Sequence, residues 1–93
     1  MTPDTLAIRA AIEQLLDELE LRAYIFTHEA KAHGLQLHIE CATDDAWQTV
    51  SLPANPSELL ASLHDVAVRE QLREAWRERL RDCAKRGESS PPT

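Results

Sequence analysis

The stretch LQLHIECATDDAWQTVSL, residues 35–52, decides the fold class of this chain. Its first half alternates strictly, with apolar side chains at Leu35, Leu37, Ile39 and Cys41 and polar side chains between them. This alternation is typical of a strand with one buried face. Residues 43–46 suit a turn, and residues 47–52 are predicted to return as a second strand that Pro53 ends. We therefore expect a two-stranded antiparallel hairpin.

The outer face of that hairpin carries the best candidate for a binding site. If Val50 and Leu52 face the core, Trp47 lies on the outer face with His38 and Glu40. Tryptophan is enriched at the energetic centres of protein interfaces. The alternative, equally open from the sequence, is that the twist of the hairpin folds Trp47 back over the core.

Residues 4–33, upstream of the hairpin, contain no glycine, proline, asparagine or serine. Apolar side chains recur there at every third or fourth position, which predicts one helix over residues 3–33, ended by Gly34. The alternative is a strand over residues 21–28, because residues 24–27 are rich in β-formers. A strand would require a change from helix to strand without any turn residue.

The length of this predicted helix leads to the prediction of a homodimer. Thirty residues of helix span about 45 Å, whereas a compact chain of this size has a radius of gyration of about 12 Å. Leu21 and Ile25 lie opposite the main apolar stripe, so the second half of the helix is apolar on two sides. We expect Leu21, Ile25 and Phe26 to lie in the dimer interface.

Two helices are predicted after the hairpin, which makes the fold α+β with the order α-β-β-α-α. Asn55 precedes Pro56, and Glu58 stands at the third helical position, a combination typical of a helix start. The apolar stripe then moves by about half a turn around the helix axis. We therefore predict a break, after which Asp65 caps a long last helix that ends before Gly87.

Length and composition limit the domain organisation. The 93 residues, 43% of them hydrophobic, predict one globular domain over residues 1–87 and a disordered polar tail over residues 88–93. No stretch approaches the ~20 apolar residues of a membrane span, and no signal peptide is recognisable. Two cysteines are too few for a disulfide scaffold, so we predict a cytoplasmic protein. Cys41 and Cys83 are expected to act as small apolar side chains, with a bridge between them left open.

The charge pattern argues against broad affinity for nucleic acids, because the net charge is −6. The last predicted helix carries a basic residue at every fourth position: Arg69, Arg73, Arg77, Arg81 and Lys85. An acidic residue stands three positions before four of these five, so a self-paired, solvated face is predicted. Arg79 lies instead within the apolar stripe. It is expected to reach the rim or to pair with Asp17 or Glu20 of the first helix.

The sequence shows no pattern of catalysis or of cofactor binding. It contains no Gly-flanked nucleophile and no glycine-rich phosphate loop, so we expect neither enzymatic activity nor a cofactor. His28 and His33 would lie about 140° apart on a helix. Glu29 shares a helix face with His33, but two ligands alone do not make a metal site.

These observations favour a non-enzymatic, homodimeric protein-binding module: a regulator, adaptor or inhibitor of the kind that phages and mobile elements encode. Its acidic first half would suit a basic surface of nucleic-acid-handling machinery. The partner-binding candidates are Trp47, His38, Glu40, Asp17, Glu20 and Arg79. One alternative is a nucleic-acid binder that uses the arginine-rich last helix, with Arg73 and Arg77 as the residues to test. Another is a small-molecule or metal-binding protein around His28, Glu29, His33 or His38.

Overall fold

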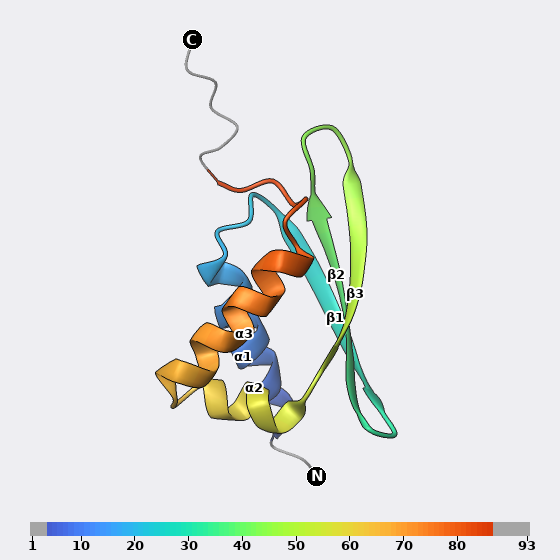
Figure 1. Cartoon of the computed structure of the whole chain (residues 1–93). Helices are drawn as coiled ribbons and strands as arrows, with labels where there is room; N and C mark the ends of the chain where they lie inside the picture. Colours follow the sequence, from blue (N-terminus) through green and yellow to red (C-terminus); the bar gives the residue numbers. More distant parts are fainter. Residues whose placement is uncertain (1–3, 87–93) are drawn as a thin grey trace.

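The three strands of this chain form one antiparallel sheet in the order β1-β2-β3. A computed structural model describes residues 4–86; the tail predicted for residues 88–93 lies outside them. The elements are α1 (Asp4–Glu18), β1 (Tyr24–Lys31), β2 (Gly34–Ala42), β3 (Trp47–Ala54), α2 (Pro56–Ser62) and α3 (Val66–Arg79). All three helices lie on one side of the sheet (Figure 1). The fold is α+β as predicted, but its sheet has three strands where a two-stranded hairpin was expected.

The additional strand is β1, which comes from the segment that was predicted as the second half of a long helix. That helix prediction is wrong, because α1 ends at Glu18 and Glu20 takes a left-handed backbone with φ 58°. The backbone N–H of Arg86 donates to the Glu20 carbonyl at 2.7 Å, which helps to hold this turn. The alternative of a strand is correct in kind, but the strand runs over Tyr24–Lys31 and not over residues 21–28, and it pairs with β2 along its whole length. Pairing between segments distant in sequence outweighed the local helical pattern there.

Gly34 does not end a helix but begins β2, directly after the turn from β1. Its φ of +139° lies in the region that favours glycine, and a Cβ there would sit 3.1 Å from the Ala54 carbonyl oxygen. Gly34 therefore serves a turn between two strands, whereas the sequence pattern placed it at the C-terminus of a helix.

The core lies between the inner face of the sheet and the helices. The sheet contributes the alternating side chains of β2 and β3, namely Leu35, Leu37, Ile39, Cys41 and Leu52. The helices and the segment after them contribute Ile8, Ile12, Leu15, Leu16, Leu59, Trp76 and Leu80. The sheet is therefore buried on one face only, and its other face is left uncovered by the described helices. None of these helices is long and apolar enough to cross a membrane.

The predicted helix starts are confirmed. The Asn55 side chain accepts from the backbone N–H groups of Ser57 and Glu58 at the start of α2. The Asp65 side chain accepts from Ala67 and Val68 in the same way, so the break between α2 and α3 falls where it was predicted. These caps satisfy N–H groups that the first turn of a helix leaves without partners.

The segment after α3 returns to the sheet and is bonded to it covalently. Cys41 of β2 and Cys83 form a disulfide with their Cα atoms 5.6 Å apart, which decides the alternative that the sequence left open. The backbone of Ala84 also accepts from Arg22 and donates to Ala42, both at 2.8 Å. Disulfides persist mainly in oxidising compartments. The bridge therefore gives no support to a cytoplasmic location, which stays a prediction.

Candidate functional site

The outer face of the sheet, which points away from the helices, is the first candidate site. Strand register places these residues on it: Ile25, Thr27, Glu29, His38, Glu40, Trp47, Thr49 and Ser51. The prediction that Trp47 shares this face with His38 and Glu40 is confirmed, and the alternative that it folds over the core is wrong. Trp47 is 57% exposed and Ile25 is 60% exposed. Two large apolar side chains thus face solvent on one side of the sheet.

A chain of polar contacts crosses the outer face from β1 to β3. The His38 ring lies between Glu29, whose Oε1 is 3.0 Å from Nε2, and Ser51, whose Oγ is 2.9 Å from Nδ1. Hydrolytic triads use the same three groups, but they also need N–H donors directed at the developing oxyanion. Strand N–H groups lie in the plane of the sheet, so those near Ser51 do not point at the outer face. We interpret the contacts as cross-strand pairing.

The charge of this surface is predominantly negative. Glu40 on the outer face and Asp44 and Asp45 in the turn between β2 and β3 are exposed. None of the three has an ion-pair partner among residues 4–86, whereas Glu29 lies 3.5 Å from Lys31. A basic partner surface would therefore find unpaired carboxylates next to the two exposed apolar side chains.

The contact between His38 and Glu29 affects the pKa of the Glu29 carboxyl group. A hydrogen bond from His38, with Lys31 close by, holds the pKa of Glu29 below its usual value. A pKa lowered by folding stabilises the folded state above the unfolded-state pKa, and this stabilisation is lost as pH falls through the folded-state pKa. We expect His38→Ala to raise the pKa of Glu29, as followed by carboxyl carbon NMR. Thr49→Ala, on the outer face of β3 opposite Glu40 and away from Glu29, is the control and should leave it unchanged. The same Glu29 titration in all three proteins would contradict the assignment.

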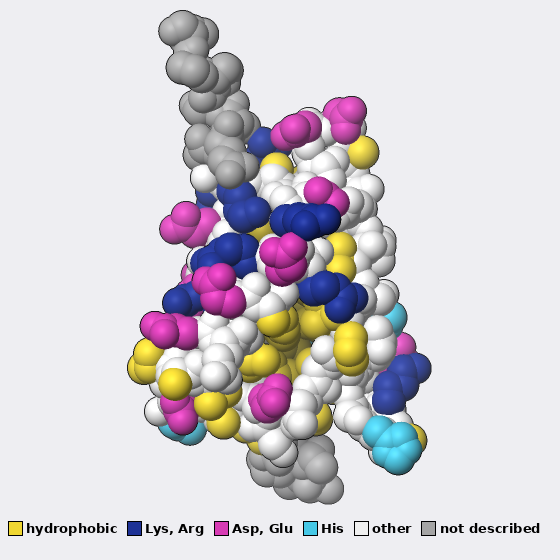
Figure 2. All heavy atoms as spheres, in the orientation of Figure 1, with side chains coloured by type: hydrophobic (Ala, Val, Ile, Leu, Met, Phe, Trp, Pro, Cys, Tyr) yellow, Lys and Arg dark blue, Asp and Glu magenta, His cyan; other side chains and the backbone are white. Residues whose placement is uncertain are grey.

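The second candidate site is an apolar groove between β3 and the helices α2 and α3, called the β3–α3 groove below. Its volume is about 390 Å³, compared with about 130 Å³ for a hollow on the outer face beside Ile25. It is lined by Leu52, Pro53, Ala54, Asn55, Glu58, Leu59, Leu72, Ala75, Trp76 and Arg79. Figure 2 shows it as an apolar hollow with basic side chains above it and an acidic side chain below. Sequence reasoning missed this groove because its walls come from three separate elements.

Arg79 lies at the rim of the groove and does not pair with the first helix. Its Nη2 donates to the backbone carbonyl of Ser51 at 2.9 Å. The expected pairing with Asp17 or Glu20 is therefore wrong, and the alternative that the side chain reaches the rim is correct. Asp17 lies instead 3.6 Å from Arg86, and Glu20 lies in the turn after α1. Neither belongs to the outer face or to the groove.

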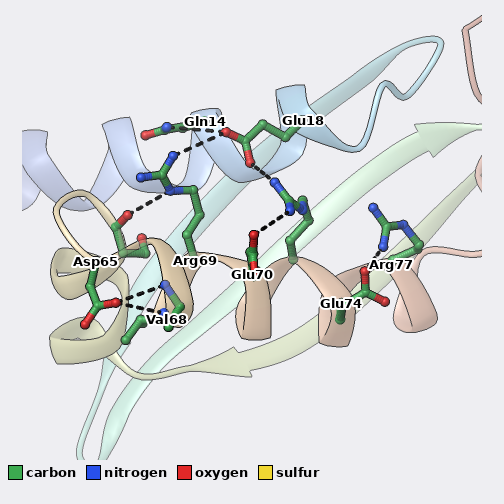
Figure 3. A network of polar contacts seen from close by, with 11 residues as sticks. Gln14, Glu18, Asp65, Val68, Arg69, Glu70, Glu74 and Arg77 are labelled. Atoms are coloured by element: carbon green, nitrogen blue, oxygen red, sulfur yellow. Dashed lines mark hydrogen bonds and ion pairs between the residues drawn. The ribbon is translucent and has the colours of Figure 1, made fainter.

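The carboxylate that does join the first helix to α3 is Glu18. It lies 2.7 Å from Arg73 and 3.8 Å from Arg69, and Gln14 donates to it at 3.4 Å (Figure 3). Sequence reasoning missed Glu18, because only the packing of α1 on α3 shows which acidic residue of the first helix faces the arginines.

Three members of the basic row pair with the acidic residue three positions earlier, as predicted: Arg77 with Glu74, Arg81 with Glu78 at 2.9 Å, and Arg73 with Glu70 at 4.0 Å. Lys85 instead donates to the Cys83 carbonyl at 3.4 Å. The last helix was predicted to continue almost to Gly87, but α3 ends at Arg79, so Arg81 and Lys85 lie beyond it. Arg69 and Arg73 are also engaged by α1. A nucleic acid would have to break these pairs to reach the guanidinium groups, so the pairing gives the nucleic-acid alternative no support.

The residues expected in a dimer interface separate into different environments. Leu21 is 3% exposed within the core of its own chain, which contradicts the expectation for it. Phe26 is half-buried on the inner side of β1, with the Arg9 guanidinium 5.4 Å from its ring centroid. Ile25 alone of the three is largely exposed. The long helix on which the dimer argument depended is absent, and of the three candidates only Ile25 remains accessible to a second copy.

The histidines do not converge on a metal. Alternation along β1 puts His28 and Glu29 on opposite faces of the strand, and His33 lies in the turn that follows. Within residues 4–86, no group of three or more histidine, cysteine, aspartate or glutamate side chains could hold a metal ion. The metal-binding alternative therefore has no support from ligand geometry within these residues, whereas the small-molecule alternative stays a prediction.

Comparison with known proteins identifies no relative: no family model matches the chain, and no curated protein or solved structure matches it either. A function is therefore inferred from the two surface features described above, the outer face of the sheet and the β3–α3 groove.

Proposed function

We propose that this chain is a non-enzymatic protein-binding module that uses the outer face of its sheet. The observation that carries the proposal is the exposure of Trp47 and Ile25 on a sheet face that no described helix covers. Apolar side chains exposed together are typical of protein interaction sites, and tryptophan is among the residues that contribute most to such interfaces. An antiparallel sheet can face water on one side, so the fold itself does not require a covering layer.

The partner that fits this face best has a basic surface. Glu40, Asp44 and Asp45 would meet its cations at the rim while Trp47 enters an apolar pocket. A regulator, adaptor or inhibitor of nucleic-acid-handling machinery would bind such a surface, because proteins of that class present arginine and lysine to phosphates.

The homodimer expected from the sequence rested on the long helix, and of its three interface candidates only Ile25 is largely exposed. Two copies that met through the outer face would bring their unpaired carboxylates together, which disfavours that arrangement. A heterologous partner is therefore the better match for this face. Light scattering at micromolar concentration tests the dimer directly, and a strict monomer would contradict it.

The proposed interface is tested by comparing Trp47→Ala with Leu6→Ala in affinity capture from cells that carry the gene. Leu6 of α1 is 76% exposed and lies outside the sheet, so its replacement removes an exposed apolar side chain elsewhere. We expect a partner that the original chain and Leu6→Ala retain and that Trp47→Ala loses, since truncating a central tryptophan costs about 2 kcal/mol or more.

A measured Kd for the captured partner completes the test. Its affinity should fall with rising salt and with Glu40→Gln, because the expected partner is basic. Equal capture by all three proteins, or a partner whose affinity is indifferent to salt, would contradict the proposal.

A further inference from the structure

The β3–α3 groove lies beside a free edge of the sheet, away from the outer face. We infer that it is a separate docking site for an extended peptide segment of a partner protein. The segment would add to β3 as an antiparallel strand, place apolar side chains in the groove and bring a carboxylate to Arg79. This inference does not depend on the outer face and goes beyond the function proposed for it.

The free edge is identified by the contact of Arg79. β3 is the last strand of the sheet, and the Ser51 carbonyl accepts from a side chain of α3 instead of from a strand. Alternate residues of an antiparallel strand direct their backbone groups to the same side. Thr49 and Pro53 therefore face this edge with Ser51, and only Pro53 lacks an N–H group. Such an edge is able to accept another strand.

The groove provides the pockets that an added strand requires for specificity. Leu52, Leu59 and Trp76 are buried in its floor. Ala75, a small residue of α3, forms part of its wall and leaves space beside it. The volume of about 390 Å³ lies within the range of ligand sites. Inward-facing side chains of an added strand, at alternate positions, would enter this space.

Charge gives the added strand its direction. Arg79 lies beside Ser51, whereas Glu58 lines the groove near its other end, beside Ala54 and Asn55. Among residues 4–86, Arg79 has no carboxylate partner and Glu58 has no ion pair. A segment antiparallel to β3 would end near Arg79 and begin near Glu58. It would therefore carry its carboxylate at the C-terminal end and a basic group at the N-terminal end.

Arg79 would act as the group that recognises the segment and opens the edge. A charge-assisted hydrogen bond to a carboxylate is stronger than the present bond to a neutral carbonyl. When the guanidinium turns to the carboxylate, the Ser51 carbonyl is released to accept from the added strand. A second copy of this chain is the other possible occupant of such an edge, and the test below distinguishes it from a peptide segment.

The test uses two pools of synthetic hexapeptides that begin with lysine and carry apolar residues at alternate positions. One pool has a free C-terminal carboxylate and the other is amidated. The full chain with Trp47→Phe is the reference, so that the fluorescence of Trp76 reports on the groove. Peptides retained in equilibrium dialysis are identified by mass spectrometry, and their Kd values are measured by fluorescence.

We expect retention from the carboxylate pool and about tenfold or greater weakening by amidation or by Arg79→Gln. Ala75→Trp should abolish retention by filling the groove. Arg81→Gln, an exposed arginine of the same region, is the matched control and should leave Kd unchanged. Thermal unfolding confirms that the variants fold, which is expected because Arg79 and Ala75 are exposed.

Three results would overturn the inference. The first is no retention from either pool by the folded chain. The second is retention that neither Ala75→Trp nor Arg79→Gln weakens. The third is a dimer, seen by light scattering, that Ala75→Trp dissociates, because the occupant would then be a second copy. The peptide test does not involve the partner expected at the outer face. A failure to find that partner would therefore leave these results unchanged, and the two proposals can fail separately.

Discussion

Replacing both cysteines by alanine is expected to lower the free energy of unfolding by about 4 kcal/mol. Cys41 and Cys83 are 42 residues apart, so their bridge closes a loop that contains β3, α2 and α3. In the chain-entropy account, a cross-link of this span restricts the unfolded chain and so raises its free energy. Since small domains are stable by only about 5–15 kcal/mol, the bridge would supply a large share of the total.

Urea denaturation of the original chain with and without reductant measures this effect, with the double alanine variant as control. Reductant should lower the midpoint of the original chain to near that of the variant and leave the variant unchanged. The structural reason is that the bridge and the two backbone bonds of Ala84 together hold the C-terminal segment on the sheet. Equal midpoints for the oxidised and reduced chains would contradict a stabilising bridge.

Leu37→Ala is expected to lower the free energy of unfolding by about 2–5 kcal/mol, the range for a fully buried leucine. Leu37 is 0% exposed and lies in the central strand of the sheet, so its removal leaves a cavity that neighbouring side chains fill only in part. Ile25→Ala is the matched control, because Ile25 lies on the outer face of the neighbouring strand. Its effect should stay within about 1 kcal/mol.

The comparison tests the one-sided burial of the sheet by chemical denaturation of both variants. A large loss for Ile25→Ala would mean that the outer face is covered, either within the chain or by a second copy. A dependence of that loss on protein concentration would identify the second copy, because only an oligomer has a concentration-dependent stability.

Helix starts and the hairpin were predictable because their signals are local. Asn55 and Asp65 cap helices through N–H groups two and three residues away, so their role is written into a few consecutive positions. Period-two alternation likewise predicted that Trp47 could share one face with His38 and Glu40, and left open whether Trp47 folds back over the core.

The first strand was not predictable with the same security, because its residues satisfy two patterns. Phe26 belongs to the helical spacing of residues 8–30 and also to the inward-facing set of β1. Only pairing with β2 decides between the two, and no Gly or Pro marks the turn that Glu20 makes. The homodimer argument failed in its original form for this reason, since it assumed the longer helix.

By itself, the sequence determined the α+β class, the caps, the β2–β3 hairpin and the polarity of the outer face, because each depends on residues within a few positions of one another. Only the tertiary structure decided that β1 is a strand, that Cys41 and Cys83 are bridged, and that the β3–α3 groove forms with Arg79 at its rim. Each of these joins segments far apart in the chain. Which distant segments meet depends on how the whole core packs, and periodicity along the chain carries no information about that.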